Sequence, residues 1–179
     1  QMCIRDRLKV HAIDGVESFD DISKAYDSLF TDRHSMIRAI LSALEIKKKY
    51  IEEDDCDRGP RNVFNYGHSF GHAIEAATDF AIPHGIAVTI GMDMANYVSQ
   101  SLHVGKKEFF DRMHVTLRQN YRNYEFTPVP LDGFLGAILK DKKNTNSEDL
   151  TLILPSSSDV VSKTVVPNDQ RFKIPVRHF

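Results

Sequence analysis

Apolar residues recur at helical spacing through most of this chain of 179 residues. The pattern predicts a short amphipathic helix over 19–30 and a longer helix over about 34–53. Thr31-Asp32 stands just before the longer helix and offers side chains that can cap its first turn. The apolar residues of the longer helix that we expect to face a core are Met36, Ile37, Ile40, Leu41 and Leu44.

The segment 86–102 is nearly all apolar and predicts a buried central helix. Its polar interruptions are Thr89, Asp93 and Asn96. Gly91 within it suggests close packing against another helix, and Gly105 is expected to end it. Further helices are predicted over 106–119 and 131–139.

The period of the pattern then changes from helical to alternating. Residues 149–154 and 160–166, separated by Pro155 and three serines, predict a small β-hairpin. We find no internal repeat, low-complexity tract or Gly-rich phosphate loop. The predicted architecture is therefore mainly α, a helical domain that carries one hairpin.

Composition limits the function classes. A hydrophobic content of 41% suffices for a normal core, and a net charge of −2 argues against nucleic-acid binding. With Cys3 and Cys56 as the only cysteines, a disulfide framework and a cysteine-based zinc site are excluded. That usage fits a reducing cytoplasm, the expected location, and no apolar run is long enough to cross a membrane.

Three histidines in a short stretch are the strongest chemical signal. His68 and His72 are four residues apart, so on a helix they share one face. Gly67 lets the backbone come close to whatever they hold, and Pro83 breaks the chain just before His84. Two imidazoles on a helix and a third from a turn indicate a zinc or iron site. The alternative for each histidine alone is a capping, packing or polar surface role.

Two sequence stretches carry a resemblance to a known family. From Asn65 to Glu75 the chain reads Asn-x-Gly-His-Ser-Phe-Gly-His-Ala-Ile-Glu, and from His84 it reads His-Gly-x-Ala-Val-x-x-Gly-Met. They resemble the signature of the 3-dehydroquinate synthase family, NAD- and metal-dependent cyclases of sugar phosphates. Matching residues elsewhere, between Lys9 and about Val166, are Leu44-Glu45-Ile46-Lys47, Asp54, Asp55, Gly59, Arg61, Asp141-Lys142-Lys143 and Leu150-Thr151-Leu152-Ile153-Leu154-Pro155.

The resemblance implies a fold, a reaction and its cofactors. It implies the helical C-terminal half of the family, without the α/β half that binds most of the NAD. The implied reaction converts a carboxylated seven-carbon sugar phosphate into a carbocycle with loss of phosphate, as in the shikimate pathway or related cyclitol synthesis. The implied cofactors are NAD and a divalent metal, Zn²⁺ or Co²⁺, and the full-length protein is expected to be a homodimer.

The spacing of the histidines and the family resemblance predict different sets of metal ligands. The pattern alone would choose His68, His72 and His84. The resemblance makes His68 and His84 ligands, whose nearest ring nitrogens we expect within about 4 Å of each other. It places His72 beside the substrate as a catalytic residue, together with Lys9. The third ligand is then a glutamate three residues before Lys9, where this sequence has Asp6.

The resemblance also assigns residues to an anionic substrate. Lys47 and Arg61 match positions that bind its charged groups, and Asn65 matches one that contacts a hydroxyl. Lys142 or Lys143 matches a phosphate-contacting lysine. Without the resemblance, Lys47 reads as a surface lysine and Asn65 as a helix cap. Glu75 continues the histidine face and is interpreted as a supporting or salt-bridged residue.

Residues 1–7 read as the translated end of a common transposon-based sequencing adapter. Our hypothesis is that this segment is an artefact and that residues 8–179 are a truncated metal- and substrate-binding domain. Such a fragment is expected to be inactive alone because it lacks the NAD domain and the natural carboxylate ligand.

Two other functions compete with the cyclase. Metal-dependent alcohol dehydrogenases related to glycerol dehydrogenase also place His-x-x-x-His before a Pro-His-Gly turn, but they have no need for lysines and an arginine that converge on anions. An inert helical fragment is the non-enzymatic alternative. Retention of Arg61 and Asn65 favours a carboxylated substrate within the cyclases.

Overall fold

The structure, a computed structural model, describes residues 2–54, 59–141, 144 and 148–179, without the side chains of residues 2, 3 and 5. The chain forms two compact units, Gln1–Phe64 and Asn65–Phe179. Both are built mainly of helices, and the second also contains a two-stranded sheet. The predicted fold class, mainly α with one hairpin, is confirmed.

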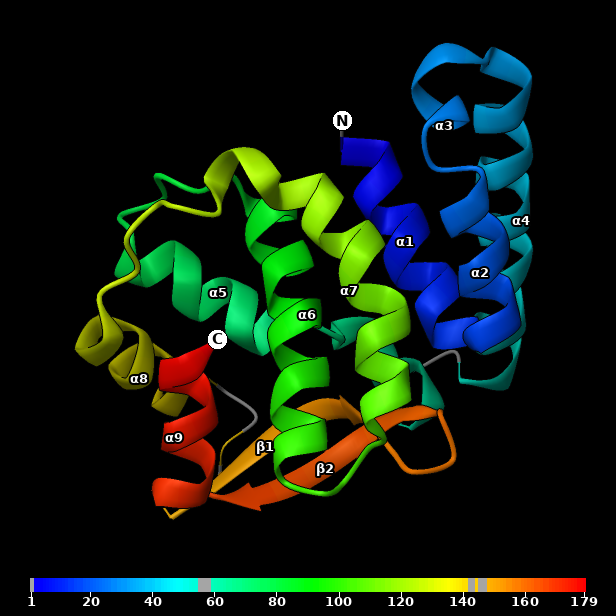
Figure 1. Ribbon diagram of the computed structural model, residues 1–179. Coiled ribbons are helices and arrows are strands. Elements are labelled where there is room, and N and C mark those ends of the chain that lie inside the picture. The colour runs from blue at the N-terminus through cyan, green and yellow to red at the C-terminus, as the bar shows by residue number, and fades with distance from the viewer. Residues whose placement is uncertain (1, 55–58, 142–143, 145–147) are drawn as a thin grey trace. The chain divides into compact units, whose positions relative to one another are not determined.

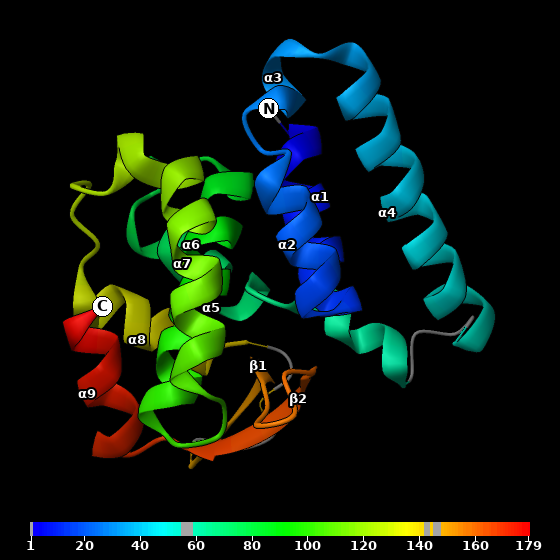
Figure 2. The same cartoon turned by 45° about the vertical axis from the view of Figure 1, so that its right-hand side comes forward.

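The first unit is a small group of antiparallel and crossing helices in which α1 contacts both α2 and α4 (Figure 2). Its helices are α1 (Met2–Asp14), α2 (Val16–Lys24), α3 (Ser28–Thr31) and α4 (Arg33–Glu53). A 3₁₀ helix, η1 (Pro60–Asn65), follows. An apolar cluster ties α1 to α4 and η1, and its members are Val10, Ala43, Ile46, Tyr50 and Phe64.

The helix α4 begins just after Thr31-Asp32, where these capping residues predicted its start. The Asp32 side chain accepts hydrogen bonds from the backbone N–H groups of His34 and Ser35 at 3.0 and 2.9 Å. The single helix predicted over 19–30 is wrong, because α2 ends at Lys24 and a turn separates it from α3. This turn lets Tyr26 bury its ring, which is only 5% exposed.

The buried face of α4 is not the one that its large apolar residues predicted. The buried residues are Ala39, Ala43 and Ile46. The prediction is wrong for Ile37, Leu41 and Leu44, which are 41%, 56% and 53% exposed, while Met36 and Ile40 are half-buried. Small alanine side chains let the backbone of α4 come close to α1, so the larger residues remain on another side of the helix.

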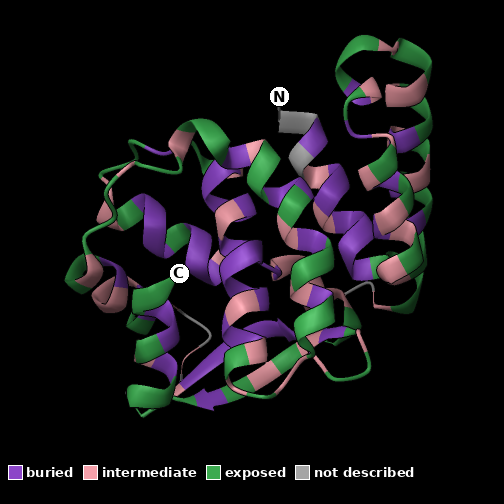
Figure 3. Cartoon of the chain, in the orientation of Figure 1, coloured by how far each residue is buried: buried purple, intermediate pink, exposed green. Residues whose placement is uncertain are grey.

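The second unit is organised around α6, which contacts α5, α7, β1 and α9 (Figure 1). Its elements are α5 (His68–Ala77), α6 (His84–Ser101), α7 (Lys107–Tyr121), η2 (Arg122–Tyr124), α8 (Leu131–Leu139), β1 (Asp149–Pro155), β2 (Val161–Pro167) and α9 (Gln170–His178). Buried residues predominate along α6, as a central helix requires (Figure 3). The prediction of a buried helix here is confirmed, although it starts at His84 and ends before Gly105.

Glycines allow α5 and α6 to cross in direct backbone contact. A Cβ atom built on Gly91 would lie 2.2 Å from the carbonyl oxygen of Gly67, closer than any real contact. A Cβ on Gly71 would lie 3.0 Å from the backbone of Val88. Gly67 itself has a φ of 76°, a left-handed conformation that suits glycine. The close packing predicted at Gly91 is confirmed, and it fixes the two histidine-bearing helices against each other.

The predicted hairpin is present as an antiparallel pair in which Asp149 lies opposite Pro167 and Pro155 opposite Val161. Two helices, α1 and α9, have no counterpart among the predicted elements. In the described part of the chain, no helix combines the length and apolar character needed to span a bilayer.

Candidate metal centre

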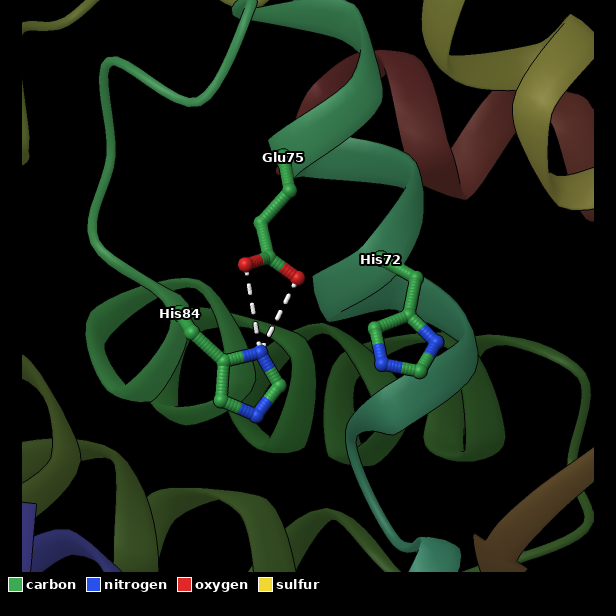
Figure 4. Close-up of side chains that lie close together, drawn as sticks. All are labelled: His72, Glu75 and His84. Atoms are coloured by element: carbon green, nitrogen blue, oxygen red, sulfur yellow. Dashed lines mark hydrogen bonds and ion pairs between the residues drawn. The ribbon is translucent and has the colours of Figure 1, made fainter.

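Two helices of the second unit bring three histidines together. His68 is the first residue of α5, and His72 lies one turn later on the same face. Pro83 caps α6 in an extended conformation, and His84 is the first residue of that helix. The side chains of His72 and His84 lie next to each other across the two helices (Figure 4). The predicted convergence of the histidines is thus present.

The three imidazole rings lie near one another, although the group of ligand atoms within 4.8 Å of one another among the described residues comprises His72, Glu75 and His84 and does not include His68. Ring centroids are 5.5 Å apart for His68 and His72, and 5.7 Å for each of the other two pairs. Ring nitrogens ~2.0–2.1 Å from one tetrahedral zinc place the centroids of two ligands roughly 5 Å apart. The observed centroid separations are somewhat longer than this.

Hydrogen bonds fix the tautomers of two of the rings. Both carboxylate oxygens of Glu75 lie close to Nδ1 of His84, at 3.0 and 3.1 Å (Figure 4). Nδ1 of His68 lies 3.2 Å from the carbonyl oxygen of Tyr66. Because neither acceptor carries a proton to donate, Nδ1 is the donor in both rings, which puts the lone pair on Nε2. Histidines that bind metals have this arrangement, with one ring nitrogen held by an acceptor and the other facing the ion.

A carboxylate also lies within reach of the histidines. His72, Glu75 and His84 each offer a ligand atom, and these atoms lie within 4.8 Å of one another. The Glu75 side chain is 9% exposed, and its carboxylate accepts a hydrogen bond from Nδ1 of His84, which offsets part of the cost of burying it. Glu75 thus contacts His84, as the supporting role interpreted for it requires. His84 belongs to every ligand set that the sequence or the geometry favours.

The first unit brings two of the predicted site lysines together. Lys47 Nζ donates to Asp6 Oδ2 at 2.6 Å, and Lys9 Nζ lies 3.8 Å from Asp6 Oδ1. Asp6 and Lys9 are three residues apart on α1, so both extend from one face of that helix. The lysines that the resemblance assigned from distant parts of the sequence are therefore neighbours in space.

Burial and neighbouring opposite charges shift the pKa values of Asp6 and Lys9 in opposite directions. Burial alone would raise the pKa of Asp6, but the hydrogen bond from Lys47 and the charges of Lys47, Lys9 and Arg7 bring it below its ordinary value. Burial lowers the pKa of Lys9, Asp6 offsets part of that effect, and the charge of Lys47 adds to it. Two lysines around one carboxylate leave an excess of positive charge, which suits an anionic ligand.

Two further predicted site residues, Arg61 and Asn65, lie in η1. Arg61 and Asn65 are half-buried, and the backbone N–H groups of Arg61 and Gly59 donate to Asp54 Oδ2 at 3.1 and 2.8 Å. Asp54 thereby fixes the start of η1. Lys142 and Lys143 lie outside the described residues. The expectation that Lys47 and Arg61 share a cleft with the histidines stays a prediction, because they belong to a different compact unit.

A buried polar group that the sequence did not assign to any site lies between α6 and α7. Asp93, fully buried, accepts hydrogen bonds on Oδ2 from His114 Nδ1 at 2.7 Å and from the Tyr121 hydroxyl at 2.6 Å. Burial raises the pKa of Asp93 despite both bonds, and the hydrogen bond to Asp93 raises the pKa of His114. A cavity of ≈ 500 Å³ is lined by His114, Tyr121 and mostly apolar side chains. In the sequence, this group is indicated by Asp93, which interrupts an otherwise apolar helix.

Several curated relatives of this chain are 3-dehydroquinate synthases. The chain is 28% identical over 159 residues to the enzyme of Campylobacter jejuni subsp. doylei, covering 88% of this chain and 45% of the relative. It is 31% identical over 137 residues to that of Helicobacter pylori, covering 75% of this chain and 40% of the relative. The chain therefore spans less than half the length of these relatives.

Solved structures share the fold. A 2-deoxy-scyllo-inosose synthase complexed with carbaglucose-6-phosphate, NAD⁺ and Co²⁺ has a TM-score of 0.66 at 22% identity, over 78% of this chain and 41% of that one. A 2-epi-5-epi-valiolone synthase from Streptomyces hygroscopicus subsp. jinggangensis, with NAD⁺ and Zn²⁺ bound, has a TM-score of 0.70 at 15% identity, over 97% of this chain and 49% of that one.

A family model decides the assignment. The model described as 3-dehydroquinate synthase C-terminal matches residues 6–144, which is most of the chain and includes both histidine-bearing helices. With that match, the chain belongs to the 3-dehydroquinate synthase family.

Proposed function

We propose that this chain is the metal- and substrate-binding part of a cyclase that converts a carboxylated seven-carbon sugar phosphate into a carbocycle and eliminates phosphate. The convergence of three imidazoles and a buried carboxylate between α5 and the first turn of α6 is the observation that carries the proposal. Family membership supplies the reaction class, and Arg61 and Asn65 favour the carboxylated substrate.

The donor set suits a divalent metal. Imidazole and carboxylate form common catalytic zinc sites, which keep a position open for substrate. His68 and His84 would hold the metal through Nε2, with Tyr66 and Glu75 orienting the rings. A bound Zn²⁺ or Co²⁺ would supply Lewis-acid polarisation of substrate oxygens. The third ligand proposed at position 6 and the set of His72, Glu75 and His84 remain alternative completions of the shell.

NAD⁺ enters the proposal through the relatives. Both solved relatives hold NAD⁺ together with a divalent metal. We propose the same cofactor here and assign no residue of this chain to it.

The chain's own side chains would position the substrate and move protons. His72 is exposed beside His84, so its imidazole could exchange a proton with a substrate oxygen. Lys9 and Lys47 would bind one anionic end of the substrate. Arg61 offers a planar, bidentate partner for a carboxylate, and Asn65 can exchange hydrogen bonds with a hydroxyl.

An alcohol dehydrogenase-like oxidoreductase is the second candidate. The histidine pattern before Pro83 fits it as well. Convergence of Lys9 and Lys47 around a single carboxylate favours the cyclase, because a small uncharged alcohol needs no such cationic group.

A chimaeric enzyme can distinguish the cyclase from the alcohol dehydrogenase-like oxidoreductase. This chain should replace the matching 159-residue region of the Campylobacter jejuni relative, so that the rest of that enzyme supplies the part that this chain does not span. The chimaera is incubated with NAD⁺, Zn²⁺ and the carboxylated sugar phosphate, and inorganic phosphate and reduced nicotinamide are followed together. The intact relative is the positive control, and His84→Ala in the chimaera is the negative one.

We expect phosphate release without net accumulation of reduced nicotinamide, because conversion of the sugar phosphate into a carbocycle and phosphate is redox-neutral overall. Accumulation of reduced nicotinamide without phosphate would establish the dehydrogenase instead. A folded chimaera that yields neither product, beside an active parent, would contradict both enzymatic proposals.

A further inference from the structure

The cavity of ≈ 500 Å³ in the second unit has walls from α5, α6, α7, α8 and α9. Both α7 and α9 pack against α6 (Figure 1). The described residues that line the cavity include none of the three histidines of the metal centre. Its volume lies within the range of small-molecule sites, about 300–1,000 Å³. The reaction proposed above makes no use of this space.

The walls of the cavity are mainly apolar and aromatic. Ile90, Met94 and Tyr97 follow one another at helical spacing, so one stripe of α6 lines the space. The ring of Tyr97 meets that of Phe110, on α7, edge to face with centroids 5.6 Å apart. The lining side chains that are almost fully buried, at 1–2% exposure, are Ile74, Ile82 and Phe134.

The face of α7 that lines the cavity changes from aromatic to cationic along the helix. His114 and Arg118 follow Phe110 at intervals of four residues, and Tyr121 comes three residues later. All four line the cavity from one side of α7, and Arg177 joins them from α9. A small molecule in the cavity would therefore meet apolar surface and positive charge together.

Existing contacts leave this positive charge in excess. Glu125, the acidic residue among the described lining residues, accepts a hydrogen bond on Oε1 from Arg118 Nε at 2.9 Å, so the two charges offset each other. Asp93 accepts from Nδ1 of His114 at 2.7 Å, which raises the pKa of His114 and leaves Nε2 as the ring nitrogen for a ligand. Arg177 adds a further positive charge. The balance at the cavity suits an anion.

We propose that the cavity is a binding site for a small aromatic carboxylate, whose ring lies between α6 and α7 and whose carboxylate meets His114 and Arg177. Imidazolium and guanidinium groups bind a carboxylate through charge-assisted hydrogen bonds. Six of the described lining residues are tyrosine or phenylalanine, which favours a planar ring over an alkyl chain, because rings make stacked and edge-on contacts. This site is independent of the proposed cyclase reaction.

The first experiment locates the ligand. The probe is 3-phenylpropionate, added to the 179-residue chain with labelled isoleucine methyl groups and followed by NMR. We expect the methyl resonances of Ile74, Ile82 and Ile90 to shift, with a dissociation constant on the order of 0.1 mM for a ligand of this size. Ile37 and Ile51, on α4 in the other unit, are internal controls and should stay in place.

The absence of any methyl shift at concentrations well above that value would overturn the proposal. Shifts of Ile37 and Ile51 as large as those of the three cavity isoleucines would also overturn it, since binding would then lack a defined place.

Two analogues test the chemistry of the ligand. The neutral 3-phenylpropanamide keeps the ring and loses the charge, whereas hexanoate keeps the charge and loses the ring. Each should bind at least about tenfold more weakly than 3-phenylpropionate. An amide that binds as tightly as the acid would rule out a cationic site. Tighter binding of hexanoate would make the occupant an alkyl acid, and either result contradicts the proposal.

Variants test the place and the charge together. Val129→Trp and Ile90→Phe each add volume to a lining side chain and should compete with the ligand. His114→Gln and Arg177→Gln should each weaken binding roughly tenfold. Lys173→Gln, on α9 but outside the lining residues, is the matched control for charge.

Circular dichroism verifies that each variant keeps its helices. Unchanged affinity in both Val129→Trp and Ile90→Phe would contradict the cavity as the site. Equal effects of Arg177→Gln and Lys173→Gln would show that the ligand responds only to the overall charge of the chain, and would contradict the proposed contact with Arg177.

Discussion

The carboxylate of Glu75 lies 3.0 Å from Nδ1 of His84 and is nearly buried, although the His84 side chain is 55% exposed. A rigid, desolvated acceptor thus holds an accessible imidazole. The ring of His84 is fixed in one orientation, and its Nε2 lone pair remains for a ligand. This pair links the end of α5 to the first turn of α6 and makes the loop between them part of the site.

Glu75→Ala should therefore weaken zinc binding roughly 10- to 100-fold, the usual effect of removing the residue that orients a ligating histidine. Glu75→Gln keeps an acceptor oxygen and should lose less. Isothermal titration with Zn²⁺ measures both, with Glu108→Ala on the surface of α7 as the control. Complete loss of binding in both variants would instead make Glu75 a direct ligand, and unchanged affinity would remove it from the site.

Gly91→Ala should destabilise the chain by about 1–3 kcal/mol or more, because its methyl group would overlap the carbonyl oxygen of Gly67. Gly136→Ala provides the matched control, since a Cβ there meets no atom within 4 Å. In the middle of α8 it should raise the stability by about 0.5–1 kcal/mol through helix propensity. Urea unfolding measures both changes. Equal effects of the two substitutions would contradict the close crossing of α5 and α6.

Stability should fall as the pH rises above about 6.5, the ordinary pKa of histidine. The hydrogen bond to Asp93 raises the pKa of His114, and burial raises that of Asp93. Both groups hold protons more tightly in the folded chain than in the unfolded one. The contribution of His114 is therefore complete below its unfolded pKa and is lost as the pH rises through its higher folded pKa.

Arg118 and Glu125 also act on His114, in opposite directions, and neither reverses the shift. His114→Gln should flatten the pH dependence of the free energy of unfolding, while His103→Gln at an exposed position should leave it as it is. Urea titrations in buffers on either side of pH 6.5 provide the comparison. A parent chain whose stability rises over that interval would refute this account of the pair.

Much of this fold could be predicted because local pattern and tertiary packing agree. The capped start of α4, the buried helix α6 and the hairpin follow directly from periodicity and turn residues. Where a helix has two apolar faces, periodicity cannot choose between them: α4 uses its alanines for close packing and leaves Leu41 and Leu44 exposed. The helix α1 has no distinct apolar side, so nothing in its pattern marked it.

The site was predictable in its histidines and less so in its surroundings. Spacing and the Pro83 turn brought His68, His72 and His84 together, and the family signature named Lys9 and Lys47. That Asp6 would join those two lysines depends on the packing of α1 against α4, which no local pattern encodes.

Arg61→Ala in the chimaera should weaken binding of the carboxylated substrate far more than binding of a carboxylate-free analogue. A guanidinium that pairs with a carboxylate contributes on the order of 1.5–3 kcal/mol, which corresponds to roughly a 10- to 150-fold change in affinity. Inhibition constants for the two analogues give the ratio. Equal losses for both would show that Arg61 acts only in the structure of η1.

Zinc titration of the 179-residue chain and its histidine variants tests the metal centre most directly. We expect one zinc ion per chain, with His68→Ala and His84→Ala each weakening binding at least about 100-fold, since each removes a ligand. His72→Gln should retain most of the affinity, and His103→Asn should behave as the parent. If zinc affinity were lost in His72→Gln and retained in His68→Ala, the metal ligands would instead be His72, Glu75 and His84. Affinity that is unchanged in His84→Ala would contradict the metal centre altogether.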